Sequence, residues 1–293
     1  MSEEATSFAN HLDAVGQHGD EAVELLATAL VLGAHRPDLA ETSEDIEQAQ
    51  TVDLTPYIQH GEELVEAARD LLQQEVAGSP ELDDLLSVVN AVLYDQFSYQ
   101  GDTENYDSLD NSSLLSVIDR RRGLPISLGI LYIHLIRALG GSAEGLNFPG
   151  HFLLSVSAGG QKVVVDPFHG GERRPLSWQR AMLKHTLGPE QPLSSEYTRS
   201  ISDRMILLRL QNNIKIRLLE AERVDAALSI LNTMIRMAPT EAVLWREAAN
   251  LQSEQGNVFA ARQSLQTFMT LSEDPTAVME AATVLQNLSR QLH

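Results

Sequence analysis

The chain has 293 residues, 43% of them hydrophobic and 21% charged, which is enough for one large or two modest hydrophobic cores. A formal net charge of -20 disfavours binding to nucleic acid or to an anionic membrane, so we expect protein or small-molecule partners. The sequence contains no cysteine, which excludes disulfides, thiolate metal sites and any thiol nucleophile from this chain. It has neither an apolar stretch of about 20 residues nor the pattern of an export signal, so we expect a cytoplasmic protein.

The first third of the chain is predicted to be helical. Residues 1–18 are polar and weakly periodic, which indicates a flexible leader or a loosely attached first helix. In 20–32, 62–76 and 81–97, apolar residues recur every three or four positions among many carboxylates, as in amphipathic helices. We therefore expect a helical subdomain over residues 19–110.

A buried helix followed by a β-hairpin is predicted next. Residues 124–139 read LPISLGILYIHLIRAL, which is apolar on nearly every face and long enough for four helical turns. Pro125 suits the first turn of this helix, because the N–H that proline lacks would be unpaired there. The periodicity then changes to two in residues 151–156 and 162–166, and the glycines between them indicate a hairpin.

The last third of the chain carries a repeat of 34 residues. Sliding the sequence by that offset places Val224, Ala226, Ala227 and Leu231 on Val258, Ala260, Ala261 and Leu265. Small alanines let paired helices approach closely. The pattern resembles the tetratricopeptide repeat, which implies helical hairpins over residues 200–293.

The predicted hairpin brings His151 and Asp166 to one face of the sheet. A four-residue loop over 157–160 would place them directly opposite each other, and a two-residue turn at Gly159 and Gly160 would place them diagonally. An aspartate that accepts a hydrogen bond from histidine Nδ1–H orients a catalytic base. The same pair can instead be structural and tie two strands together, so both interpretations stay open.

The order of these motifs resembles the transglutaminase-like, papain-related core. It is carried by Gly123-Leu-Pro125 before the buried helix, Gly150-His151-Phe152, and Val165-Asp166-Pro167. The strings 111–115, 120–128, 147–152 and 165–171 are similar to bacterial SirB-type proteins, whose core is followed by tetratricopeptide helices. The resemblance implies an α+β fold with a helical N-terminal subdomain, a transglutaminase-like α/β core over 111–190 and all-α hairpins at the C-terminus.

The same resemblance assigns roles to individual residues. It matches His151 and Asp166 to the family histidine and aspartate, and it puts Pro125 where active members carry their nucleophilic cysteine. A cysteine-dependent transglutaminase or protease is therefore excluded, and the His–Asp pair is expected to be vestigial. Ser127 lies two residues further on, about 200° around the helix axis from residue 125, and is the remaining candidate nucleophile.

Three further groups of residues are candidates for binding. Arg120, Arg121 and Arg122 can receive a carboxylate or phosphate, or can pair with acidic residues of the N-terminal helices. Phe148 and Phe168 bracket the His–Asp pair and are expected to line a cleft that holds an extended peptide, with His169 beside them.

His169 can also join His151 and Asp166 around a metal ion. Their spacing matches no recognised ligand pattern, so we expect neither a metal nor a cofactor.

Together these features favour a non-catalytic protein that acts in protein–protein recognition or regulation. The alternative is a hydrolase of another mechanism that uses Ser127, or a water molecule activated by His151 and Asp166. In a third interpretation the His–Asp pair is structural and all partner contacts lie on the repeats.

Overall fold

The computed structural model describes residues 3–40, 52–188 and 194–290, and it divides the chain into two compact units. The core unit comprises residues 23–35 and 51–210, and the repeat unit comprises residues 1–22, 36–50 and 211–293. The boundary near residue 210 falls inside one long helix, α9 (Asp203–Glu220). Residues 1 and 2 of the expected leader and the expected end of the core at residue 190 lie outside the described residues.

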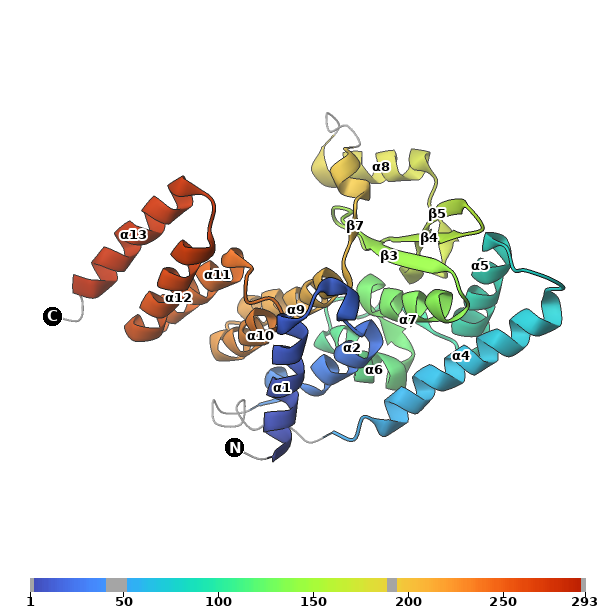
Figure 1. Ribbon diagram of the computed structural model, residues 1–293, viewed down its shortest axis with the longest axis horizontal. Coiled ribbons are helices and arrows are strands. Elements are labelled where there is room, and N and C mark those ends of the chain that lie inside the picture. The colour runs from blue at the N-terminus through green and yellow to red at the C-terminus, as the bar shows by residue number, and fades with distance from the viewer. Residues whose placement is uncertain (1–2, 41–51, 189–193, 291–293) are drawn as a thin grey trace. The chain divides into compact units, whose positions relative to one another are not determined.

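The core unit combines a five-stranded sheet with helices. The sheet is antiparallel throughout and has the order β6-β5-β4-β3-β7 (Figure 1). Its strands are β3 (Ser142–Leu146), β4 (Leu154–Ala158), β5 (Gln161–Asp166), β6 (Glu172–Arg173) and β7 (Ser200–Ile201). Two shorter strands, β1 (Gln100–Gly101) and β2 (Arg122–Gly123), form a separate parallel pair.

The α-helices of the core unit lie against this sheet or pack on one another. They are α2 (Leu25–Ala34), α4 (Thr55–Glu75), α5 (Leu82–Asn90), α6 (Leu114–Arg120), α7 (Pro125–Ala138) and α8 (Leu176–Leu187). A π-helical segment, Ala91–Gln96, continues α5, and the short 3-10 helices in this unit are η4 (Leu109–Ser112), η5 (Pro167–His169) and η6 (Ser195–Thr198). Figure 1 shows α7 beneath the sheet and α8 above it.

Helix α7 is the predicted central helix. It begins at Pro125, as the missing N–H favours, and its residues are buried from Pro125 to Ile133. Gly129 explains how the helix approaches the sheet, since a Cβ there would lie 2.6 Å from the Phe152 ring. The uninterrupted apolar sequence of α7 therefore reflects packing on all sides.

The hairpin of β4 and β5 has the shorter of the two expected loops. Leu154 pairs with Val165 and Ala158 with Gln161, which leaves Gly159 and Gly160 as a two-residue turn. Both glycines have positive φ, 57° and 79°, as a type I′ turn requires. The strand β4 begins three residues later than the predicted 151, so His151 lies in the turn before it.

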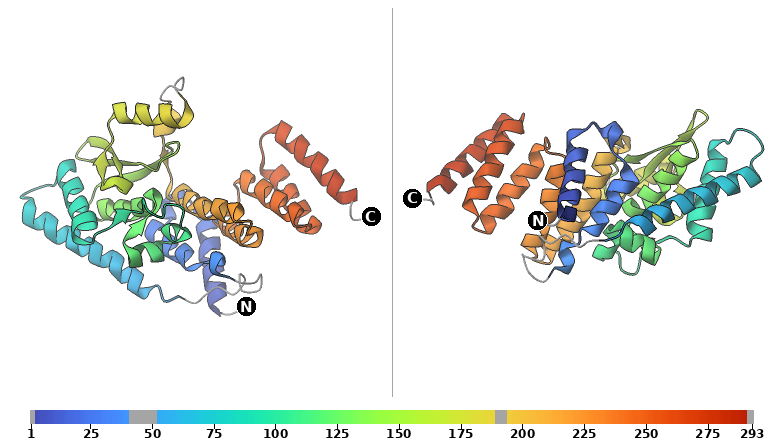
Figure 2. Two further views of the ribbon diagram at one scale, coloured as in Figure 1. Left: turned by 180° about the vertical axis from the view of Figure 1, so that it is seen from behind. Right: turned by 60° about the horizontal axis from the view of Figure 1, so that its bottom comes forward.

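The repeat unit is helical in its described part. It contains α1 (Glu3–Gln17), η1 (Asp20–Ala22), η2 (Pro37–Leu39), α10 (Val224–Met237), α11 (Ala242–Glu254), α12 (Val258–Leu271), α13 (Pro275–Arg290) and the second half of α9. Helices α10 and α12 begin 34 residues apart, as the sequence repeat predicts. In Figure 2 the helices α11 to α13 follow one another side by side, and a shared apolar core that includes Leu265 and Phe268 joins them.

The N-terminal third differs from the expected single subdomain. Residues 3–17 form the helix α1, which has Leu12 fully buried and pairs Asp13 with Arg236 of α10 at 2.8 Å. Arg223 donates to the carbonyl oxygens of Pro37 and Ala40, at 3.2 and 2.7 Å. Helices α2, α4 and α5 instead pack against α7 in the core unit. The sequence reveals these helices but not which distant segment each one packs against.

Candidate functional site

Asp166 is the centre of a densely connected polar group in the core unit. It ends β5, and its side chain is completely buried. Its Oδ1 atom accepts a hydrogen bond from the backbone N–H of Phe168 at 3.1 Å. Its Oδ2 atom accepts from Nε of Arg174 at 2.9 Å and lies 2.8 Å from Nη2 of the same residue. Nδ1 of His169 also lies 2.9 Å from Oδ2, so several nitrogen atoms converge on one carboxylate oxygen.

His151 reaches the same oxygen atom from another direction. Its Nε2 atom lies 3.0 Å from Oδ2 of Asp166, but that buried nitrogen makes no aligned hydrogen bond with any protein atom. The sequence predicts that His151 and Asp166 lie together, and the structure places them together. It is Nε2 rather than the expected Nδ1 that faces the carboxylate.

The carboxyl group of Asp166 stays ionised in this setting. Burial alone would raise its pKa. The contact with His151, the hydrogen bond from Arg174 and the charge of His169 outweigh burial and hold the pKa well below its usual range. A carboxylate that is charged at neutral pH therefore lies in a position that has no contact with solvent.

Two residues of this group were not anticipated from the sequence. The guanidinium group of Arg174 lies 4.5 Å from the centre of the Trp178 ring, and the His151 ring meets Trp178 edge-on at 6.0 Å. Asp166 pairs with Glu172 across the β5–β6 hairpin, which brings Arg174 back beside Asp166. The glycine pair at 170 and 171 signals such a turn and is the cue that would have suggested Arg174.

His151, Asp166 and His169 form a compact set of possible ligands. One ligand atom from each lies within 4.8 Å of the others. The His169 side chain is 49% exposed and that of His151 12%, so the set runs from the interior to the surface. The three residues lie together although their spacing in the sequence predicts no metal site.

Comparison with known proteins identifies the family of the core. The sequence model described as the transglutaminase-like superfamily matches residues 56–212, which is more than half of the chain. The chain belongs to the transglutaminase-like superfamily. A tetratricopeptide repeat model matches residues 214–286. Both matches confirm the resemblance drawn from the sequence, for the core and for the repeats.

Two bacterial relatives align with this chain over most of their length. A UPF0162 protein of Xylella fastidiosa is 28% identical over 258 residues, covering 86% of this chain and 85% of the relative. A UPF0162 protein of Pseudomonas aeruginosa is 30% identical over 233 residues, covering 73% of this chain and 85% of the relative. F-box only protein 21 of Homo sapiens is 39% identical over 84 residues, which is 29% of this chain and 13% of that protein.

Among solved structures, a crystal structure of menin, described as revealing the binding site for the Mixed Lineage Leukemia protein, aligns with 94% of this chain. Its TM-score is 0.38 and its identity 12%, a likeness too distant to inform the function.

At the start of α7 the polar side chain of Ser127 is hydrogen-bonded to the backbone. Pro125 is buried in the first turn of α7 and has no titratable group. Ser127 is also buried, and its hydroxyl lies within hydrogen-bonding distance of the carbonyl oxygens of Asn111 and Leu124, at 2.9 and 3.0 Å. Its proton is directed at backbone acceptors rather than at His151. The packing is tight here, because a Cβ at Gly123 would lie 2.6 Å from the Ser127 oxygen.

The three arginines before α7 are engaged within the core unit. Arg120 lies 3.5 Å from Asp102 and also donates to Asn111, and Arg122 donates to Glu104 at 2.8 Å. These acidic partners lie in the loop that follows β1, not on the N-terminal helices as the alternative interpretation expected.

Arg121 lies among aromatic side chains instead. It donates to Nε2 of His60 at 2.7 Å and to the Tyr99 hydroxyl at 2.6 Å. Burial raises the pKa of Tyr99 to about 12, although the charge of Arg121 opposes the shift. All three arginines thus have partners within the protein.

The two aromatic residues expected to line a cleft have different surroundings. Phe148 is only 1% exposed and packs in an apolar cluster with Leu153, Leu183 and Trp178, so it offers no surface to a peptide. Phe168 is half-buried, and its ring contacts His169 edge-on at 5.2 Å. The sheet and α8 thus enclose Phe148, which is not the cleft residue that the sequence predicts, whereas Phe168 and His169 stay partly exposed.

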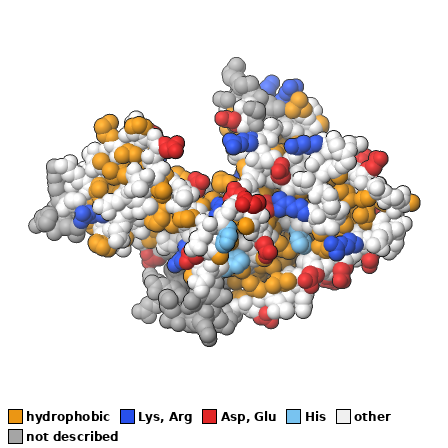
Figure 3. Space-filling model, in the orientation of Figure 1, with side chains coloured by type: hydrophobic (Ala, Val, Ile, Leu, Met, Phe, Trp, Pro, Cys, Tyr) orange, Lys and Arg blue, Asp and Glu red, His pale blue; other side chains and the backbone are white. Residues whose placement is uncertain are grey.

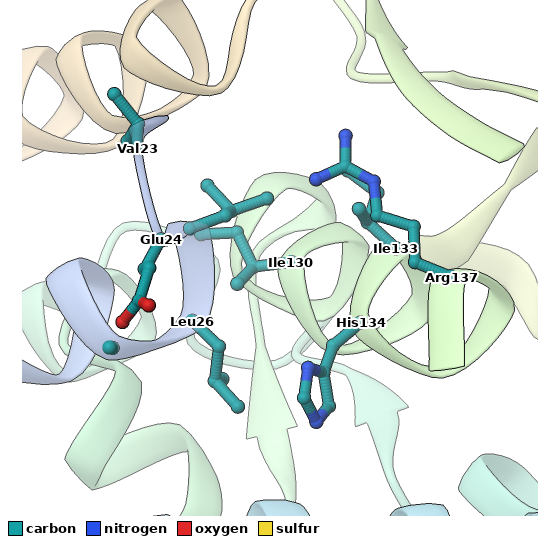
Figure 4. A pocket seen from close by; sticks show the side chains of 9 residues that line it. Val23, Glu24, Leu26, Ile130, Ile133, His134 and Arg137 are labelled. Atoms are coloured by element: carbon teal, nitrogen blue, oxygen red, sulfur yellow. The ribbon is translucent and has the colours of Figure 1, made fainter. Parts of the chain in front are cut away.

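A pocket of about 330 Å³ lies elsewhere in the core unit (Figure 4). The start of α2 and one side of α7 supply its lining, which includes Leu26, Ile130, Ile133 and His134. Burial lowers the pKa of His134, which leaves the imidazole neutral near pH 7.

Arg137 at the edge of the pocket is held by Asp203, at 2.6 and 2.9 Å. The pocket is therefore mainly apolar, and it contains none of the residues around Asp166.

No helix in the described part of the chain is both long enough and apolar enough to cross a membrane.

Proposed function

We propose that this chain is a non-catalytic transglutaminase-like protein whose work is to recognise a protein partner. The observation that carries the proposal is the state of the nucleophile position. Pro125 begins α7 where the family resemblance places a cysteine, and the whole chain contains no cysteine. Ser127, the nearest hydroxyl in the sequence, directs its hydrogen-bonding capacity to two backbone carbonyl groups. An acyl-transfer reaction would lack the attacking atom.

The repeat unit supplies the surface that we assign to the partner. Large apolar side chains are exposed on it, and Figure 3 shows hydrophobic side chains over the C-terminal helices. Ile216, Val243 and Val284 are 44%, 51% and 45% exposed and lie on α9, α11 and α13. These are the first helices of successive hairpins, which in repeat proteins stack to form a concave binding surface.

The spacing of these three residues supports a shared stripe. Positions 216, 250 and 284 are separated by the 34-residue repeat, so they are equivalent in successive hairpins. Val243 precedes position 250 by seven residues, or about two helical turns, and lies on the same face of α11. We call Ile216, Val243 and Val284 the repeat stripe. An aliphatic stripe of this kind suits the apolar face of a peptide or helix.

A binding experiment with charge-matched variants tests this function. The intact protein, tagged at one end, is used to capture partners from a lysate of the native host, beside Val243→Glu with Val284→Glu. The control is Gln263→Glu with Gln266→Glu, which adds the same charge at exposed positions on α12. We expect one saturable partner that the stripe variant loses and the control retains. Equal capture by both variants would contradict the role of the stripe.

The enzymatic alternative has its own test on the same protein. A serine-reactive phosphonate should leave the chain unlabelled, because the Ser127 hydroxyl is buried and hydrogen-bonded to the backbone. The intact protein and His151→Ala should also show equal background rates on ester and amide substrates. A saturable hydrolysis that disappears in His151→Ala would establish water activation by His151 and refute the non-catalytic function.

A further inference from the structure

The group around Asp166 has the dimensions of a metal site. In a tetrahedral zinc site with bonds of about 2.0–2.2 Å, neighbouring ligand atoms lie roughly 3.3 Å apart. Nε2 of His151 and Nδ1 of His169 lie 3.0 and 2.9 Å from Oδ2 of Asp166. Each nitrogen atom therefore lies nearly as far from the carboxylate oxygen as two ligands of one ion would, and all three atoms lie within 4.8 Å of one another.

The buried nitrogen of His151 is the observation that favours an ion over a simple ion-pair cluster. Nε2 of His151 is enclosed by protein and has no aligned hydrogen-bond partner. Leaving a buried polar atom without a partner is unfavourable, and such atoms are rare in folded proteins. A metal ion bonded to Nε2 would satisfy this atom and would hold the imidazole against the carboxylate.

Asp166 has the supporting contacts that metal-bound carboxylates usually have. Ligating carboxylates are hydrogen-bonded in turn by neighbouring groups, which fix their orientation. The N–H of Phe168 holds Oδ1 at 3.1 Å, and Arg174 holds Oδ2 through Nε at 2.9 Å. A carboxylate oxygen has two lone pairs, so Oδ2 can accept from Arg174 and still bind an ion. Arg174 is itself fixed by Trp178 and by Glu172, at 2.6 Å.

We propose that His151, Asp166 and His169 form a binding site for a divalent transition-metal ion, with Zn²⁺ the best match. Two imidazole nitrogens and one carboxylate oxygen suit zinc, whereas Mg²⁺ and Ca²⁺ prefer oxygen ligands throughout. Three protein ligands leave a fourth position for water. The half-exposed His169 gives the ion a path from solvent. The site goes beyond the proposed partner recognition, and it stands whether or not the repeat stripe binds a protein.

Metal titration of the full-length protein tests the site. Tag-free protein is treated with a chelator, dialysed and titrated with Zn²⁺ by calorimetry. A parallel titration with Co²⁺ is followed by visible absorption, which reports low-symmetry coordination by nitrogen and oxygen. Because loss of supporting contacts alone weakens metal binding by about 10–100-fold, His151→Ala and His169→Ala should each weaken it by at least about tenfold. The control is His185→Ala, which removes an exposed histidine of α8 outside the site.

We expect one ion per chain, bound equally by the intact protein and His185→Ala and more weakly by both site variants. The His169→Ala variant is the decisive one, because the half-exposed side chain of His169 can be removed with little risk to folding. Equal Zn²⁺ affinity of His169→Ala and the intact protein would overturn the proposal, as would the absence of saturable one-to-one binding.

Discussion

The two ends of the transglutaminase-like core differ in how their polar side chains are satisfied. At the start of α7, the Ser127 hydroxyl and the guanidinium groups of Arg120 and Arg122 each reach a carbonyl or an acidic side chain. At the end of β5, three charged or chargeable side chains crowd one buried oxygen of Asp166, and Nε2 of His151 has no aligned partner. The polar groups at the start of α7 are satisfied within the protein and stabilise the fold. Those at the end of β5 leave a buried nitrogen atom that can still bind a ligand.

Removal of the Asp166 carboxylate should have the largest effect on stability. Asp166→Ala leaves the Arg174 guanidinium, only 11% exposed, without its main partner. Breaking a buried pair costs about 3–5 kcal/mol, and we expect about 3 kcal/mol because Arg174 keeps Glu172. Urea unfolding followed by circular dichroism measures the change. Asp83→Ala is the control, because it breaks an exposed carboxylate–arginine pair and should cost at most about 1 kcal/mol. Equal losses of unfolding free energy in Asp166→Ala and Asp83→Ala would show that the buried ion pair stabilises the protein no more than the exposed one.

Removal of the Ser127 hydroxyl should have a smaller effect, and only on stability. Both of its acceptors keep another donor, because Asn111 O accepts from Leu124 N at 3.3 Å and Leu124 O accepts from Leu128 N at 3.1 Å. Ser127→Ala should therefore lower the free energy of unfolding by about 1 kcal/mol, the net value of one ordinary hydrogen bond. Urea unfolding at neutral pH measures it. If the intact protein hydrolyses a substrate and Ser127→Ala does so more slowly at matched stability, Ser127 is a nucleophile after all.

Acidification should lower the stability of the protein through His60, which contacts Arg121 just before α7. Burial and the charge of Arg121 lower the pKa of His60, although Glu63 opposes the shift. The unfolded chain takes up a proton at about pH 6.5, before folded His60 does, so stability falls as the pH drops through 6.5 towards the lower folded pKa. Urea unfolding at about pH 7 and pH 5 measures this loss, which His60→Gln should reduce. An unchanged pH dependence in His60→Gln would show that other groups cause it.

The exposed pair at the same end should have the smallest effect. Arg122 and Glu104 lie 2.8 Å apart, and their side chains are 38% and 72% exposed. Solvent-exposed pairs of this kind contribute about 0–1 kcal/mol. Arg122→Ala should leave the melting temperature nearly unchanged, and added salt should remove any difference, as differential scanning calorimetry can show. A larger loss would mean that Arg122 supports the turn into α7 by more than its ion pair.

Local patterns in the sequence were sufficient for much of this architecture. The apolar run of α7, the glycine turn between β4 and β5 and the 34-residue repeat each specify an element through its own residues. The proximity of His151 and Asp166 follows from the same hairpin, because its two-residue glycine turn is one of the loop lengths predicted to bring them to one face. These features depend on contacts between residues that are close in the sequence.

Features that depend on contacts between residues distant in the sequence could not be predicted from it. Phe148 resembles a cleft residue because turn residues follow it, but packing against Trp178 and Leu183 buries it. Arg174 looks like a surface arginine until the β5–β6 hairpin folds it back onto Asp166. The partners of Arg120 and Arg122 depend on the path of the loop after β1, which has no periodic pattern to reveal it.

Helix α1 has a consequence for the order in which the protein is made. Asp13 of α1 pairs with Arg236 of α10, which is 223 residues further along the chain. At typical rates of synthesis, the ribosome needs on the order of tens of seconds to cover that distance. During this interval Leu12, which is completely buried in the finished protein, has no access to its final partners. Helix α1 therefore waits for a helix that is made much later, and a chaperone that shields its apolar side chains in this interval would reduce aggregation of the nascent chain.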